Sequence, residues 1–309
     1  MPTIFLLALV AIALILQAKN KSLEGLKYKY ELSQNLVAPD EIFILITSLS
    51  NHSLRFIPFV KMEEALPTGK TLNSTVYLMP RSKLVRKAPI SLPTRGRYLF
   101  TGAILRGGDF LGLRESYQEV ESPNELIVYP KPSEETQINK LISGFLGDIS
   151  VRRFIIEDPI LTVGFREYSG REPMKAISWP QSARSGQLMV KTYDYSSELS
   201  ASVVLDVEHD RPESIENCLS IAHQVCLILE KQKVKYDFYS NILPEGANNR
   251  WAYISAGLGQ GHLRAILEGL GRATHYASEP SDKLLERVKK KESMIFITPK
   301  SEKGIIFKI

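Results

Sequence analysis

GFREYSGREPMKAISWPQSARSGQLMVK, residues 164–191, concentrates charged and aromatic side chains more densely than any other part of this 309-residue chain. The stretch lies between a first half with strand-like patterns and a second half in which strands and helices alternate. Trp179-Pro180 predicts an extended residue followed by a helix, and Gly186 predicts the end of that helix. The two halves are therefore expected to be separate units on either side of this stretch.

The composition is that of an ordinary globular protein, and the length favours two domains plus an appendage. The chain is mildly basic, with a net charge of +5 and a pI of about 9.0. This balance favours a phospholipid leaflet or a carboxylate-rich partner, and nucleic acid is not expected. Cys218 and Cys226 follow a helical pattern that separates them by about 12 Å, which is too far for a disulfide. Both are expected to be buried, reduced side chains.

The N-terminus begins with an unbroken apolar run, Thr3–Leu16, followed by Lys19 and Lys21. The run is slightly short of the ~17–25 residues that span a bilayer. A signal peptide would begin with basic residues, and none precedes this run. A buried core helix is unusual at the N-terminus of a chain. We expect a short N-terminal membrane anchor over residues 1–21, a single-pass location, and a cytoplasmic bulk by the positive-inside rule.

The first half carries several short strand patterns separated by Pro and Gly, which favour a β-sandwich. The expected strands are Lys27–Leu32, Ile42–Thr47, Phe56–Val60, Thr71–Tyr77, Arg97–Leu105 and Glu125–Tyr129. Several cations and no acidic residue lie between Arg81 and Arg106, which indicates either a solvated strand face or a lipid-facing patch.

The second half shows a helix over Glu134–Leu146, then two strands, Leu188–Tyr195 and Ser200–Val207, around a Ser-Ser-Glu turn. The alternation after Asp206 predicts an α/β sheet covered on both faces. The expected fold class is an α+β multidomain protein with an N-terminal membrane helix, a β-sandwich and an α/β domain. The expected boundaries are 1–21 (anchor), 22–131 (β-sandwich), 132–187 (linker and central stretch) and 188–309 (α/β domain).

The central stretch resembles the bacterial family catalogued as domain of unknown function fifty-eight. The matching residues are Gly164, Arg166, Tyr168, Ile177, Trp179, Ala183 and Arg184. Arg171, Glu172 and Lys175 stand where that family usually has glycine, aspartate and arginine. Upstream, the segments 95–98, 108–113 and 128–130 also look like this family. The resemblance implies a membrane-anchored β-domain, a von Willebrand factor A-like α/β domain, and a partner among MoxR-type AAA+ ATPases.

The polar side chains of the central stretch admit two interpretations. The candidates are Arg166, Tyr168, Glu172, Lys175, Trp179 and Arg184. Arginine forms forked pairs with carboxylates, and Glu167 and Glu172 are the nearest ones. In the first interpretation, these residues form a docking surface for a partner or a site for an anionic ligand. In the second, they form a clasp that holds the two units together.

Metal binding is a further hypothesis, because von Willebrand A domains hold Mg²⁺ in an Asp-x-Ser-x-Ser loop after the first strand. Here that loop keeps Asp206 but replaces both serines by Glu208 and Asp210. Asp210 is equally explained as a helix cap. Mg²⁺ is the one cofactor that the sequence suggests, and the simpler expectation is no cofactor. The glycines of 257–261 suggest a phosphate cradle or, more simply, a loop that enters a helix.

No catalytic motif is present: the chain lacks Gly-x-Ser-x-Gly, His-Glu-x-x-His and Cys-x-x-Cys, and its five histidines are dispersed. We therefore expect a non-enzymatic, membrane-tethered accessory protein that presents a docking surface to a cytoplasmic MoxR-type AAA+ ATPase. The alternatives are a module that binds anionic lipid or another anionic ligand, and a metal-dependent, adhesion-like domain.

Overall fold

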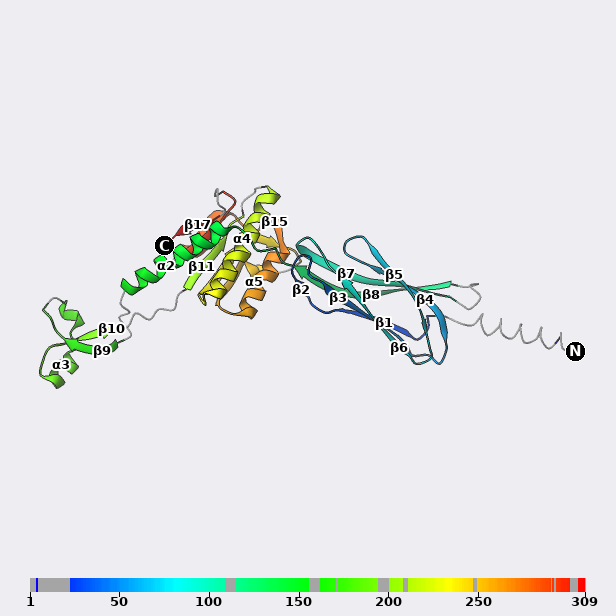
Figure 1. The fold of residues 1–309 in the computed structure, drawn as a ribbon, viewed down its shortest axis with the longest axis horizontal. Helices are drawn as coiled ribbons and strands as arrows, with labels where there is room; N and C mark the ends of the chain where they lie inside the picture. The colour runs from blue at the N-terminus through cyan, green and yellow to red at the C-terminus, as the bar shows by residue number, and fades with distance from the viewer. Residues whose placement is uncertain are drawn as a thin grey trace. The chain divides into compact units, whose positions relative to one another are not determined.

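The computed structural model describes residues 4, 23–108, 115–155, 162–170, 172–193, 200–207, 211–246, 249–289, 291, 293–300 and 305–308. The chain divides into two compact units, Met1–Pro130 and Lys131–Ile309, whose elements are drawn in Figure 1. Strands make up 45% of the described residues and helices 27%, so this part of the chain is mostly β, where an α+β fold class was expected.

The expected membrane helix requires a correction. No helix in the described part of the chain is long and apolar enough to cross a bilayer. The expected anchor, residues 1–21, lies outside the described residues apart from Ile4. The apolar run Thr3–Leu16 is itself shorter than the ~17–25 residues that a spanning helix needs. The fold class built on a membrane helix and the single-pass membrane location are therefore wrong as predictions.

The first unit consists of two packed sheets, one of three strands in the order β1-β3-β6 and one of five in the order β2-β8-β7-β4-β5. The pairs are antiparallel except for β2 with β8. The strands are β1 (Leu26–Leu32), β2 (Leu36–Val37), β3 (Phe43–Asn51), β4 (Ile57–Ala65), β5 (Thr71–Leu78), β6 (Lys83–Ile90), β7 (Gly96–Gly108) and β8 (Glu115–Val128).

Alternating side chains build the core between these sheets. In β3 every second residue is buried, and the ring of Phe43 meets the ring of Phe100 from β7 edge to face, 6.2 Å between centroids. Tyr30 of β1 contacts the same phenylalanine. This alternation is the period-two pattern that a half-buried strand requires. Gly102 permits a bulge in β7: a Cβ atom there would lie 2.0 Å from the carbonyl oxygen of Val120.

The second unit contains a five-stranded sheet in the order β14-β12-β11-β16-β17. β11 pairs in parallel with both β12 and β16, and the outer strands are antiparallel. The strands are β11 (Ser200–Leu205), β12 (Lys235–Ser240), β14 (Tyr253–Gly257), β16 (Met294–Ile297) and β17 (Ile305–Lys308), beside a separate pair, β13 (Ile242–Pro244) and β15 (Ala273–Ala277).

Helices cover this sheet. The helical elements are α2 (Thr136–Ile155), α4 (Pro212–Lys231), α5 (Gln260–Arg272), α6 (Ser281–Val288) and the short 3₁₀ turn η2 (Asn249–Ala252). α4 and α5 lie side by side, and α2 packs on α4. α6 buries Leu284 and Val288 against Val204 of β11 and Tyr239 of β12. Cys218 and Cys226 are buried in α4 and form no disulfide, as the helical pattern predicted.

A third group of elements, residues 162–193, separates α2 from β11 along the chain, and we call it the central module. It contains β9 (Thr162–Glu167), the 3₁₀ turn η1 (Met174–Ala176), α3 (Trp179–Ser185) and β10 (Met189–Tyr193). β10 pairs with β9, whereas β11 is the centre of the α/β sheet. The two strands expected around the Ser-Ser-Glu turn therefore belong to different sheets, and the turn, at 194–199, lies outside the described residues.

Candidate functional site

The central module is built around a buried serine. The hydroxyl of Ser182 in α3 donates to the carbonyl oxygen of Ser178 at 2.8 Å and accepts the backbone N–H of Met189 at 2.8 Å. Ile177 forms a bridge with Val190, and both are buried. α3 is thereby fixed against β10, and it ends as expected at Gly186, whose φ of 73° is the left-handed conformation typical of helix ends.

Glu172 organises the loop between β9 and η1. Its carboxylate accepts the hydroxyl of Ser169 at 2.7 Å and the backbone N–H of Ser169 at 3.2 Å, and forms an ion pair with Arg166 at 2.6 Å. The hydroxyl of Tyr168 donates to the carbonyl oxygen of Glu172 at 3.3 Å. The hydrogen bonds from Ser169 and the ion pair with Arg166 lower the pKa of the Glu172 carboxyl to about 2. The carboxylate is therefore a fixed anion at neutral pH.

The remaining predicted residues lie outside this network, on the module's surface. Trp179 is 58% exposed and Met174 is 69% exposed. Lys175 and Arg184 are exposed as well. Within the described residues, the side chains of Lys175, Trp179 and Arg184 make no hydrogen bond or ion pair. The structure thus joins Arg166, Tyr168 and Glu172 into one cluster and leaves the other three candidates facing solvent. Whether they clasp the two units together stays a prediction.

A second polar cluster lies where the parallel strands of the α/β sheet end. Asp206 follows β11, Asn241 follows β12 and Thr298 follows β16, so all three are at the carboxyl edge of the sheet. β12 and β16 flank β11 on opposite sides, which makes this edge the topological switch point where α/β sheets generally bind ligands. All three residues are buried.

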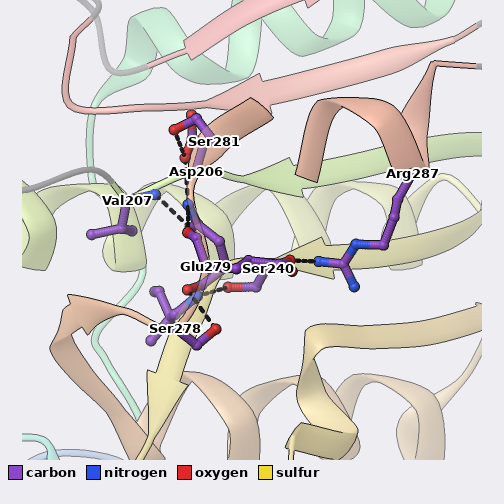
Figure 2. Close-up of polar contacts among 9 residues, drawn as sticks. Asp206, Val207, Ser240, Ser278, Glu279, Ser281 and Arg287 are labelled. Atoms are coloured by element: carbon purple, nitrogen blue, oxygen red, sulfur yellow. Dashed lines mark hydrogen bonds and ion pairs between the residues drawn. The ribbon is translucent and has the colours of Figure 1, made fainter. Parts of the chain in front are cut away.

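Hydrogen bonds tie this edge together. One carboxylate oxygen of Asp206 accepts the side-chain amide of Asn241 at 2.6 Å and the hydroxyl of Ser281, the first residue of α6, at 2.8 Å. Figure 2 shows Ser281 facing Asp206, with Val207 and Ser278 at the same edge. The amide oxygen of Asn241 accepts the backbone N–H of Val207 at 2.8 Å. Asp206 thereby links two strand ends to the start of a helix.

This arrangement bears on the metal hypothesis. Because the N–H of Val207 can only donate, the Asn241 oxygen faces it, and the amide NH₂ faces Asp206. Two donors therefore occupy one oxygen, Oδ1, of the Asp206 carboxylate, so the described contacts of this residue are those of a structural tie. Glu208 and Asp210 lie outside the described residues. The described residues contain no group of three His, Cys, Asp or Glu side chains placed to hold a metal.

The glycine-rich stretch 257–261 also has an internal partner. The backbone N–H of Gly259, at the start of α5, donates to both carboxylate oxygens of Glu230 from α4, at 3.1 and 2.9 Å. A helix N-terminus favours an anion, and here the protein's own carboxylate supplies it. The simpler reading of these glycines, a loop that enters a helix, accounts for this contact.

Several residues of both clusters were not predicted from the sequence. Ser169 and Ser182 hold the central module together, and Asn241 and Ser281 hold Asp206. Serine and asparagine are common in loops, and the partners of Asp206 are 35 and 75 residues away in the chain. Only the position of Ser182 before a predicted helix end gave any local signal.

Comparison with known proteins identifies no family: no family model matches, and no curated protein matches. Solved structures give partial matches. The CARDB domain of a Pyrococcus furiosus protein, in complex with di-metal ions, is 17% identical, with 34% of this chain and 94% of that chain covered and a TM-score of 0.25. A putative late embryogenesis abundant protein is 12% identical over 41% of this chain and 86% of its own, with a TM-score of 0.24. Pseudomonas fluorescens alkylpurine DNA glycosylase AlkC is 11% identical over 32% and 31%, with a TM-score of 0.22.

Proposed function

We propose that this protein is a non-enzymatic accessory protein that docks another protein through its central module. The observation that carries the proposal is the exposure of Trp179 and Met174 beside Lys175 and Arg184, on a module whose loop is fixed by Glu172. Tryptophan is among the residues that contribute most to binding at interfaces, and a rigid scaffold lowers the entropic cost of docking.

The surface cations of the module favour a partner with carboxylates. Among the described residues of the module, the exposed cations outside the Arg166–Glu172 pair are Lys175, Arg184 and Lys191. The one exposed carboxylate outside that pair belongs to Glu167. Positive side chains around an aromatic anchor complement an acidic patch on the partner and increase the association rate. The family resemblance of the central stretch suggests a MoxR-type AAA+ ATPase as that partner.

The proposal is tested with the full chain and the purified MoxR-type ATPase of the same cells. Trp179→Ala and Lys175→Glu should each weaken binding in a calorimetric titration, the tryptophan variant by about thirtyfold, because a central aromatic anchor contributes about 2 kcal/mol. Tyr276→Ala and Lys283→Glu are the matched controls, since both residues are exposed elsewhere in the second unit. Equal affinities for all five proteins would refute the role of the module.

The alternative, an anionic small-molecule site at the central arginines, predicts heat on titration with inorganic phosphate that Arg166→Ala abolishes, whereas the docking proposal predicts no such heat. Arg166 is already engaged by Glu172, which leaves it less able to hold a second anion. A titration with inorganic phosphate should therefore give no heat that Arg166→Ala abolishes.

A further inference from the structure

One end of the β-sandwich is an ordered surface formed by two loops, residues 52–56 and 79–82, with the adjoining ends of β5 and β6, and we call this surface the sandwich tip. The side-chain amide of Asn51 donates to the carbonyl oxygens of Arg55, at 2.8 Å, and Met79, at 3.0 Å. The backbone N–H of Arg81 donates to the carbonyl oxygen of Ser53 at 3.1 Å. These bonds hold the two loops together, so their side chains form one surface.

The tip exposes large apolar side chains. Leu54, Tyr77 and Met79 are each more than half exposed, and the ring of Tyr77 packs beside that of Phe56, 6.4 Å between centroids. Tyr77 and Met79 flank the buried Leu78 in sequence, so both point away from the core. Apolar side chains gathered on a loop surface mark an interaction site more often than single exposed ones do.

A basic pocket adjoins this apolar surface. It has a volume of about 380 Å³ and is lined by Ser50, Asn51, His52, Arg81, Ser82 and Lys83. A second pocket, lined by Tyr77 and Met79 among others, shares Ser82 and Lys83 with it. Cations and hydroxyls thus border the apolar side chains directly, and the lining of the basic pocket includes no carboxylate among the described residues.

The chain also enters the sandwich at this tip. The backbone N–H of His52 donates to the carbonyl oxygen of Gly25 at 2.9 Å. Gly25, in the first described turn of the sandwich, therefore lies at the junction of that turn with the tip. Glu24 adds one carboxylate at the junction.

We propose that the sandwich tip binds the surface of an anionic phospholipid bilayer. Leu54, Tyr77 and Met79 enter the headgroup region, while Arg81 and Lys83 contact lipid phosphates. Amphipathic surfaces with aromatic and aliphatic side chains beside cations bind interfaces in this way, and tyrosine is enriched at the headgroup level. Each cation near an anionic leaflet is attracted to it electrostatically, and added salt weakens this attraction. The contact is peripheral and requires no spanning helix.

A fluorescent label at the tip tests this proposal in the full chain. Met79→Cys is labelled with NBD, which is feasible because Cys218 and Cys226 are buried. The label should shift to the blue with phosphatidylglycerol-containing vesicles, remain unshifted with pure phosphatidylcholine vesicles, and return toward its aqueous emission in high salt. Ile42→Cys is the control, since Ile42 is 66% exposed immediately before β3, at the opposite end of that strand from Asn51, and should remain in water.

A charge variant provides the second readout. Arg81→Gln with Lys83→Gln should weaken vesicle binding of the labelled protein by about thirtyfold, given the attraction of two cations to an anionic leaflet. Lys70→Gln with Lys87→Gln removes the same charge from exposed positions elsewhere in the sandwich and should have a much smaller effect. A label that stays aqueous with anionic vesicles, or shifts equally at position 42, overturns the proposal. A label that instead responds only to an added protein identifies the tip as a protein interface.

Discussion

Glu172 shows how neighbouring donors set the chemistry of a single side chain in the central module. Its pKa is lowered from 4.5 to about 2 by Ser169 and by Arg166. Because the folded pKa lies below the unfolded value, the ionised carboxylate stabilises the module fully above pH 4.5, and this stabilisation is lost as the pH falls through about 2.

The first prediction concerns this pKa. A carbon-detected NMR titration of the Glu172 carboxyl should give a midpoint near 2 in the wild type, and Ser169→Ala should move the midpoint toward 4.5 because the largest cause of the shift is removed. Ser185→Ala, which removes another serine hydroxyl of the module, should leave the midpoint in place. A wild-type midpoint near 4.5 would contradict the network described here.

Glu64 is the carboxylate of the first unit that, like Glu172 in the central module, is held by several donors. It joins the two sheets. Its carboxylate, on β4, accepts the hydroxyls of Tyr28 and Thr47, each at 2.7 Å, and pairs with Arg86 of β6. The Glu64 side chain is only 3% exposed. Burial, together with the charge of Glu64, strongly raises the pKa of Tyr28, so that hydroxyl remains a donor throughout the accessible pH range.

The second prediction is that Glu64→Gln lowers the free energy of unfolding by about 3 kcal/mol, because Arg86 loses the counter-ion of a largely buried pair. The measurement is urea denaturation of the full chain followed by circular dichroism. Glu63→Gln is the control: its partners Lys61 and Arg106 are about half exposed, and exposed ion pairs contribute little to stability, so this variant should lose much less than Glu64→Gln. Similar losses for both variants would mean that burial does not decide the cost.

At the scale of elements, the end of α3 depends on one backbone conformation. Gly186 has a φ of 73°, and a Cβ atom there would meet no neighbouring atom within 4 Å. Gly186→Ala should therefore cost about 1 kcal/mol through backbone strain alone. We expect the amide of Met189, which bonds to Ser182 across this turn, to exchange about fivefold faster. Gly164→Ala, a position in β9 with equal space and no left-handed φ, should not change that rate.

The tie between β12 and α6 supports a fourth prediction. Asn241→Ala removes the partner of the Val207 N–H and one donor to the buried Asp206 carboxylate, so it should lower the free energy of unfolding by about 2 kcal/mol. The same denaturation experiment with Asn139→Ala, whose side chain bonds Gln224 at the surface, should show less than about 1 kcal/mol. An unaffected Asn241→Ala variant would show that the tie contributes little.

Local patterns predicted elements well and pairing poorly. Most of the β-sandwich strands and the limits of α3 followed from alternation, glycine and proline, but residues 115–124 of β8 were not predicted. β6 was missed because lysines and Pro89 interrupt its apolar residues; both are typical of edge strands, and β6 lies at an edge of its sheet. The assignment of β10 and β11 to different sheets was unpredictable, since strand pairing depends on contacts far apart in sequence.

At the scale of the whole molecule, the same limit applies to the candidate sites. The pair of Arg166 with Glu172 was foreseeable because the two residues are close in sequence. The partners of Asp206 come from later strands and helices, and no local pattern indicates them. The expectation of a single-pass membrane protein was wrong, because no helix in the described residues is long and apolar enough to cross a bilayer. The sandwich tip joins two loops that are far apart in sequence, so only the fold reveals it.

The fifth prediction tests the central claim, that residues 162–193 dock a protein partner. Hydrogen exchange of the full chain is measured by mass spectrometry with and without the MoxR-type ATPase, at concentrations where calorimetry shows binding. The docking role predicts slower exchange in peptides that cover η1 and α3, and no such slowing when Trp179→Ala is mixed with the same ATPase. Binding accompanied by protection confined to other parts of the chain would contradict it.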